Sequence, residues 1–441
     1  MGPTALQSSI GWILSGPCPH NNTEHTYITT LFTNSTLDEQ LHKFWDLESM
    51  GIVDTSIYDD LVENIVFENG RYQVELPWKQ PHSFLQDNYK LSLKRLRNLR
   101  QRLLSDPKLY SEYDSIIQEQ KIQGIIEPID ISTPNDGTVH YLPHHAVLRN
   151  DKSTTKVRIV FDASAKVNQN ASLNDCLYVG QSLNQKILDI ILRFRTYPIA
   201  LTGDIEKAFL MITLPEKDRD VLRFLWFDDF SKPDPQIVCY RFTRVVFGVC
   251  SSPFLLNAIL KYHAEKYIQD NPEFVKTFLR SIYVDDFTSG AQSEDEAFEL
   301  YKSAKSKLLD GGFNLRKFKT NSSTLQTKID ECESNRNNSE QVDKSIQEDD
   351  ESYAKLMVGS QSESSENLKI LGVEWNPSTD EFVYNLEGIS QLANSVLPTK
   401  RNVVSISAKF CDPLGFLQPL IVMFKILFRE LCRANLEWDD L

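Results

Sequence analysis

Two adjacent acids, Asp285 and Asp286, stand inside a short apolar and β-prone stretch that runs from Ser281 to Gly290. Successive side chains of a β-strand point to opposite faces, so neighbouring acids fit poorly inside a strand and best at a tight hairpin. A hairpin tip presents carboxylates to a cleft while its arms pack into a sheet. Two carboxylates held close together and partly removed from water need a cation to remain ionised. We therefore expect a hairpin with a bound cation here, and an exposed Asp-rich turn is the alternative.

A third acid, Asp204, follows the apolar segment 199–203 far upstream. This segment predicts a buried strand that delivers a single acid at its end, followed by a helical turn. One acid after a strand and two at a distant hairpin form a set of hard oxygen ligands suited to Mg²⁺ or Mn²⁺. Two such ions about 3.5–4 Å apart activate a hydroxyl and stabilise a leaving phosphate oxygen. The three acids together therefore predict phosphoryl-transfer chemistry.

Motifs in a consistent order surround these acids, namely Tyr141–His145, Arg158–Ser164, Ser172–Asp175, Asp204–Phe209, Phe247–Gly248 with Ser252–Pro253, and Tyr283–Asp286. In that order they resemble the reverse transcriptases of LTR retrotransposons, most closely the Pao/BEL group, and the resemblance continues through 412–415 and 438–440. It implies an α+β right-hand polymerase fold with fingers, palm and a partial thumb/connection. It also implies an RNA-directed DNA polymerase that transfers nucleotides from dNTPs to a primer 3′-OH.

The resemblance assigns a role to each candidate site residue. Asp204, Asp285 and Asp286 are the expected ligands of two Mg²⁺ ions, for which Mn²⁺ can substitute. Lys319 is the expected general acid for the leaving pyrophosphate, with Lys317 as its competitor. The residues expected to bind the incoming dNTP are Lys156, Arg158, Phe209, Phe247 and Gly248.

Physical reasons support the nucleotide-binding group. Lys156 and Arg158 lie on one arm of a predicted hairpin over 141–163, where a guanidinium fork and an ammonium suit phosphate oxygens. In the resemblance Phe209 lies under the sugar and excludes a 2′-hydroxyl, and Gly248 allows a close backbone approach. Taken singly, each residue also has a non-functional interpretation: Lys156 and Arg158 as solvated bases of a strand, and Phe209 as an ordinary core ring. The tandem His144 and His145 have no partners at ligand spacing, so we expect them to pack or to form hydrogen bonds rather than to bind a metal.

The net charge of −14 disfavours nucleic-acid binding only when it is taken as a sum. Residues 322–366 contain 11 acids and 4 bases, which accounts for half of that charge. Bases gather instead along 90–108, on a predicted amphipathic helix over 88–104. The seven cysteines form no Cys-x-x-Cys pair, which suits a reducing compartment. No apolar run approaches the roughly 20 residues of a membrane span.

Five regions are expected. Residues 1–25 resemble the C-terminal edge of a retropepsin-like protease, but Asp54–Ser56 lacks the glycine of its catalytic loop, so we reject protease activity. Residues 26–125 form a mostly helical connecting region, with a helix over 37–51, and 126–320 form the fingers and palm. Residues 321–367 are an acidic disordered insertion. Residues 368–441 complete the palm and enter the thumb/connection, stopping before RNase H.

The expected partners are an RNA template, a DNA or RNA primer, dNTPs and other Pol domains (RNase H, integrase, protease), with no membrane. The expected location is the cytoplasm, including retrotransposon particles. A rival hypothesis is a non-catalytic, transposon-derived fragment that binds nucleic acid or protein. The three intact acids favour the enzyme, because a non-catalytic fragment has no physical need for them.

Overall fold

The computed structural model describes residues 57–79, 85–130, 138–148, 157–168, 170–230, 232, 234–335 and 368–440, with residues 4–8, 11–15, 56 and 336–339 described by backbone alone. The chain divides into two units, Met1–Ile57 and Tyr58–Leu441. In the first unit, β1 (Thr4–Ser8) pairs antiparallel with β2 (Gly11–Ser15). The expected strand near Ile10–Gly16 is therefore present, whereas its origin in a protease remains a prediction. The helix predicted over 37–51 lies outside the described residues, and so do Asp54 and Thr55 of the triplet Asp54–Ser56.

The second unit begins within α2 (Ser56–Glu63) and continues with the hairpin of β3 (Val66–Glu68) and β4 (Arg71–Gln73) and with two long helices. In α3 (Tyr89–Leu104), leucines three or four positions apart, including Leu96, Leu99 and Leu103, are buried on one face. This confirms the amphipathic helix. The next helix, α4 (Pro107–Ile122), starts at Pro107 after Asp106, whose carboxylate accepts a hydrogen bond from the Leu109 amide.

A three-stranded antiparallel sheet has the order β5-β10-β9, formed by β5 (Ile126–Ile129), β10 (Ile237–Phe242) and β9 (Arg223–Phe227). Between β5 and β9 in the sequence, β6 (His144–Leu148) and β7 (Val157–Phe161) form the predicted antiparallel hairpin. Every residue of β9 is buried, which explains its run of apolar side chains.

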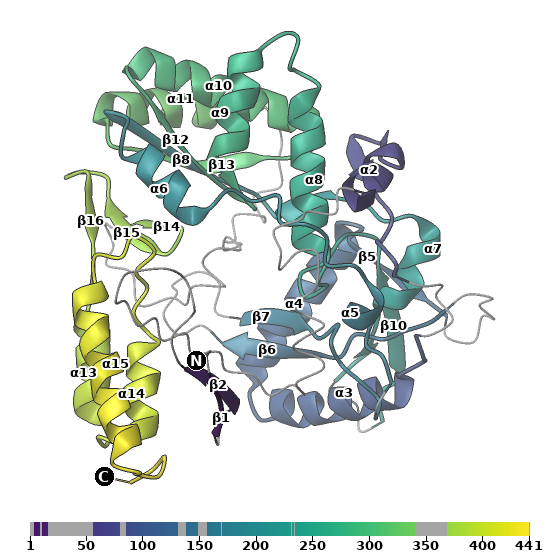
Figure 1. Cartoon of the computed structure of the whole chain (residues 1–441). Helices are drawn as coiled ribbons and strands as arrows, with labels where there is room; N and C mark the ends of the chain where they lie inside the picture. The colour runs from purple at the N-terminus through teal and green to yellow at the C-terminus, as the bar shows by residue number, and fades with distance from the viewer. Residues whose placement is uncertain are drawn as a thin grey trace. The chain divides into compact units, whose positions relative to one another are not determined.

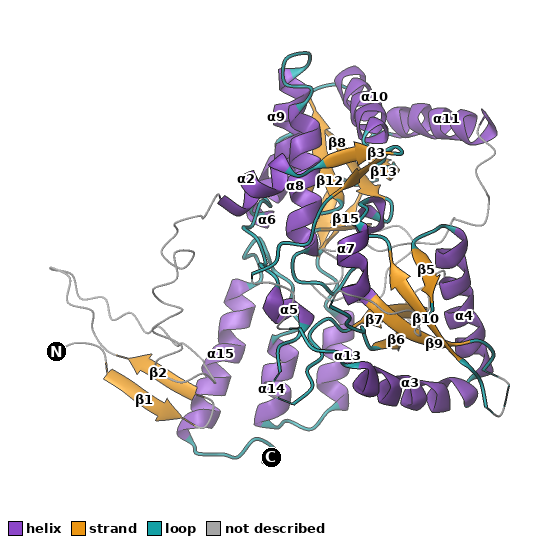
Figure 2. Ribbon diagram, turned by 90° about the vertical axis from the view of Figure 1, so that its right-hand side faces the viewer, coloured by secondary structure: helices purple, strands orange, loops and turns teal. Residues whose placement is uncertain are grey.

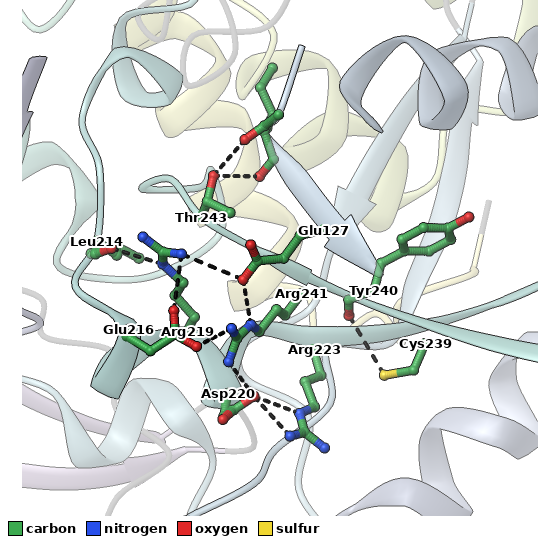
Figure 3. Close-up of polar contacts among 12 residues, drawn as sticks. Glu127, Leu214, Glu216, Arg219, Asp220, Arg223, Cys239, Tyr240, Arg241 and Thr243 are labelled. Atoms are coloured by element: carbon green, nitrogen blue, oxygen red, sulfur yellow. Dashed lines mark hydrogen bonds and ion pairs between the residues drawn. The ribbon is translucent and has the colours of Figure 1, made fainter. Parts of the chain in front are cut away.

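An ion-pair network ties this sheet to the short helix α7 (Glu216–Arg219) and the turn η3 (Asp220–Leu222) (Figure 3). Arg241 on β10 donates to Glu127 of β5 at 2.6 Å and to Asp220 at 3.1 Å, and it also pairs with Glu216. Arg223 donates to the same Asp220 oxygen at 2.9 Å. The guanidinium forks of Arg241 and Arg223 thus join β5, α7, η3, β9 and β10 through charge-assisted hydrogen bonds.

The sheet that carries the acids is antiparallel and four-stranded, in the order β11-β12-β8-β13. Phe287 at its centre is fully buried, and so are Leu201 and Leu315. Helices α9 and α10 pack on the sheet, and α6 contacts β12 (Figure 1). The elements are α6 (Ile187–Phe194), β8 (Ile199–Ile205), α8 (Ser252–Glu265), α9 (Pro272–Ser281), β11 (Ile282–Tyr283), β12 (Asp286–Ala291), α10 (Glu294–Asp310) and β13 (Leu315–Thr320).

The expected disordered insertion over 321–367 needs a correction in its first part. Ser323–Ser339 form the helix α11, in which Leu325 and Ile329 are fully buried, and the helix contacts α10 and β13. Glu333 of α11 also pairs with the buried Lys305 at 2.9 Å. Two apolar residues one helical turn apart anchor the helix, and this is too weak a pattern to stand out in a polar sequence. Residues 340–367 lie outside the described part.

The last segment contains a three-stranded sheet and three helices. Trp375 of β15 is fully buried against Phe194 and Ile190 of α6, so the strand expected over 369–375 rejoins the main core. Helices α13, α14 and α15 follow, and α14 packs along α15 (Figure 2). The elements are β14 (Leu368–Ile370), β15 (Val373–Asn376), β16 (Glu381–Val383), α13 (Glu387–Ser395), α14 (Lys400–Ser407) and α15 (Gln418–Arg433).

The fold of the second unit is α+β, because its paired strands are antiparallel and its helices pack on them. Within the described residues, none of the helices is both long and apolar enough to span a membrane.

Candidate active site

The two adjacent acids lie at a tight hairpin, as predicted. Tyr283 pairs with Asp286, which leaves a two-residue loop of Val284 and Asp285. Val284 has φ +56°, and positive φ at the first loop position is typical of a type II′ turn, which twists as the strands do. A β-branched residue in this region is a conformational outlier. The tip is therefore strained, and Val284 is nevertheless completely buried.

Asp286 and Asp204 are direct cross-strand partners between β12 and β8. On the other side of β8, Arg316 of β13 is the partner of Asp204. Residues opposite one another in an antiparallel pair share a face, so these three side chains form one row across the sheet. Like charges in such a row destabilise each other, and the two acids therefore favour a cation beside them.

Arg316 is a residue that the sequence analysis missed. Its Nε is 3.8 Å from Asp204 Oδ2, and its Nη1 is 3.0 Å from Glu206 Oε1. Asn314 donates to the other Glu206 oxygen at 2.7 Å, which orients that carboxylate. The register shifts between Arg316 and Lys319, so simple alternation along 315–320 does not reveal which bases face the acids.

The third acid, Asp285, is 6% exposed, and its carbonyl oxygen accepts a hydrogen bond from the Ile205 amide at 2.8 Å. This bond joins the hairpin tip to the end of β8, directly after Asp204. Three carboxylates are a suitable donor set for Mg²⁺, and two of them are adjacent in register. Among the described residues, however, no three acidic, histidine or cysteine side chains are gathered closely enough to form a ready metal site.

The aromatic candidates lie together. Phe209 belongs to the turn η2 (Ala208–Met211) just after β8, and its ring centroid is 6.1 Å from that of Phe247, in an edge-on arrangement. Phe209 is 9% exposed and Phe247 is 38% exposed. Phe247 thus has a partly exposed ring beside the buried ring of Phe209.

Gly248 permits a close contact within the protein itself. It has φ +102°, and a Cβ at this position would lie 2.5 Å from the Phe161 carbonyl oxygen at the end of β7. Asn174 holds the same loop by donating to the Gly248 carbonyl at 3.1 Å and accepting from the Cys250 amide at 2.8 Å. The motif residue Asn174 therefore fixes the loop next to Phe247, a role that its sequence position did not reveal.

The basic candidates are distributed over two strands. Arg158 is on β7 opposite Val147, and it is partly exposed. Lys156 lies outside the described residues. Lys319 is exposed on β13 and pairs with Thr202, two residues before Asp204 on β8, so it shares the face of the acids. Its competitor Lys317 sits in the irregular part of the strand with φ +55°.

Comparison with known families agrees with this arrangement. The family model described as reverse transcriptase (RNA-dependent DNA polymerase) matches residues 151–375, slightly more than half of the chain. The match contains all three acids, their hairpin and the Phe247–Gly248 loop. The chain belongs to the reverse transcriptase family.

A second family model, described as the Pao retrotransposon-like RNaseH-like domain, matches residues 399–441. Together the two matches make the chain a Pol sequence of a Pao-type retrotransposon, as the motifs predicted. The second match includes α14 and α15, for which we expected a thumb or connection, and that assignment remains a prediction. No curated protein matches the sequence.

Proposed function

We propose that this chain catalyses RNA-templated DNA synthesis by two-metal nucleotidyl transfer. The observation that carries the proposal is the cross-strand pairing of Asp286 with Asp204, with Asp285 at the adjoining hairpin tip. In this proposal the four-stranded sheet is the palm and the β6–β7 hairpin belongs to the fingers. Template RNA and primer are the macromolecular partners, and dNTPs are the substrates.

In this proposal each candidate site residue has a separate role. Asp204, Asp285 and Asp286 would hold two Mg²⁺ ions, which would supply activation of the primer 3′-hydroxyl and stabilisation of negative charge on the leaving phosphate oxygen. Phe209 would support the deoxyribose, and the exposed Phe247 ring would face the incoming base or sugar. Arg158 and Lys156 would bind the triphosphate, and Lys319 would hold the proton for the departing pyrophosphate.

Primer extension on a poly-rA/oligo-dT template, with labelled dTTP and Mg²⁺ or Mn²⁺, tests the proposal. We expect Asp285→Asn to abolish extension while the protein stays folded. Asp270→Asn is the matched control, because Asp270 is exposed and lies in a turn outside the sheet. Extension retained in the Asp285 variant would refute the metal-ligand assignment.

The same assay distinguishes the proposed polymerase from the rival, non-catalytic function. If the folded wild-type protein extends no primer but binds the same duplex, the chain is a non-catalytic nucleic-acid-binding protein. The binding assay should then be repeated with Asp285→Asn, which would leave such binding unchanged.

A further inference from the structure

The hairpin tip is held by a side chain from a distant part of the sequence. The Val284 amide donates a hydrogen bond to Asn184 Oδ1 at 3.1 Å, across a separation of 100 residues. Because an amide N–H can only donate, the Asn184 oxygen, and not its nitrogen, faces the tip. Asn184 lies just before α6 and is partly exposed.

This bond acts on the strained residue of the turn. Val284 has φ +56°, a conformation that a valine leaves readily unless its surroundings hold it. The hydrogen bonds that restrain the loop include the Asn184 bond at Val284 and the bond from the Ile205 amide to the Asp285 carbonyl. The second bond fixes the tip to β8, and the first fixes the Tyr283–Val284 peptide, at the start of the two-residue loop.

We propose that Asn184 is a positioning residue, which holds the Val284 turn so that the Asp285 and Asp286 carboxylates face Asp204. The inference rests on the proposed polymerase function. It assigns a role to a side chain outside all of the motifs that identify the family. Carboxylates must be held to within a fraction of an ångström for efficient catalysis, and a strained turn without its restraint would lose this precision.

The kinetic test compares Asn184→Ala with a matched control. Asn321 has a similar but remote role, because its Oδ1 accepts from the Ala200 amide at 2.8 Å, at the opposite end of β8 from Asp204. We expect Asn184→Ala to lower kcat about tenfold while KM for dTTP changes less than about twofold. Asn321→Ala should leave both constants near the wild-type values. A wild-type kcat in Asn184→Ala, or an equal loss in the two variants, would overturn the inference.

A double-mutant cycle with Val284→Gly identifies the cause. Glycine adopts positive φ without strain, so the restraint from Asn184 should matter less in that background. We expect Asn184→Ala to lower kcat by a smaller factor in Val284→Gly than in the wild type. The same loss in both backgrounds would show that Asn184 does not act through the turn.

Amide hydrogen exchange separates this inference from the proposed function. In Asn184→Ala we expect the Val284 amide to exchange faster, on the order of tenfold, because its acceptor is gone. Asn321→Ala should not change it. If the wild-type protein extends no primer, the proposed function fails, and the exchange result alone decides whether Asn184 holds the turn. Unchanged exchange at Val284 would overturn the inference whatever the activity.

Discussion

Arg316 lies directly opposite Asp204 on the neighbouring strand, with its Nε 3.8 Å from Asp204 Oδ2. Asp286 occupies the opposite flank of the same aspartate. The candidate metal site thus contains a built-in positive charge. Arg316 Nη1 pairs with Glu206 at 3.0 Å, whereas its Nε and Nη2 are buried and make no hydrogen bond within the described structure.

Replacing Arg316 by Gln should therefore destabilise the protein most when divalent cations are absent. We expect a loss of about 1–3 kcal/mol in the free energy of unfolding, since Asp204 and Glu206 lose their shared cation. Added Mg²⁺ or Mn²⁺ should stabilise the variant more than the wild type, because a bound ion replaces the missing charge. Urea unfolding with EDTA and with Mg²⁺ measures both effects. Arg316→Lys is the control that keeps the charge, and equal stabilisation of all three proteins by Mg²⁺ would contradict the prediction.

Lys319, rather than Lys317, should act as the general acid. Lys319 pairs with Thr202 on the face that carries Asp204, whereas Lys317 lies in the register shift. We expect Lys319→Gln to lower the single-turnover rate constant of nucleotide incorporation about 100-fold or more. Lys319→Arg should recover part of this rate. Lys317→Gln should retain most activity. The reverse order of the two Gln variants would assign the role to Lys317.

Phe209→Val should relax sugar selection. The Phe209 ring is 9% exposed beside Phe247, and a smaller side chain would leave room for a 2′-hydroxyl. We expect the ratio of kcat/KM for UTP to that for dTTP to rise about 10–100-fold. Because both substrates are measured on one preparation, partial unfolding of the variant cancels in the ratio. An unchanged ratio would show that another group selects the sugar.

His144 should make stability depend on pH. Its Nε2–H donates to the Leu225 carbonyl at 2.9 Å, so its Nδ1 accepts from the Tyr113 hydroxyl at 2.5 Å. Burial lowers the His144 pKa to about 4. The unfolded chain, in which histidine has a pKa near 6.5, takes up the proton first as the pH falls. The stability contributed by neutral His144 is complete above pH ~6.5 and is lost between about 6.5 and 4.

The size of this effect follows from the pKa difference, which corresponds to about 3 kcal/mol. His144→Gln keeps a donor and an acceptor but does not ionise. Urea unfolding of the two proteins from pH 7 to pH 4.5 should therefore show a steeper loss for the wild type. Parallel curves would mean that His144 is already protonated in the folded protein or does not limit its stability.

Much of the fold can be read from local sequence patterns. The leucines of 88–104 predicted α3 because they recur every three or four residues. Packing or hydrogen bonding was expected for His144 and His145, and His144 is both buried and hydrogen-bonded. The tight hairpin at Asp285 followed from the incompatibility of two adjacent acids with a strand interior. The helix α11 was missed, because its burial rests on Leu325 and Ile329 meeting α10 and β13, contacts that no local pattern predicts.

The sequence by itself determined the hairpin, the strand that ends at Asp204 and the family. Turns and strand periodicity depend on neighbouring residues, and the order of the motifs can be read directly from the sequence. Only the tertiary structure decided which residues meet. The register that places Asp286 and Arg316 on either side of Asp204, and the bond from Asn184 to Val284, join segments about 80 to 110 residues apart. A slip of one residue would turn these side chains to the other face. Packing of the buried strands against one another sets that register, so the sequence of a single strand does not determine it.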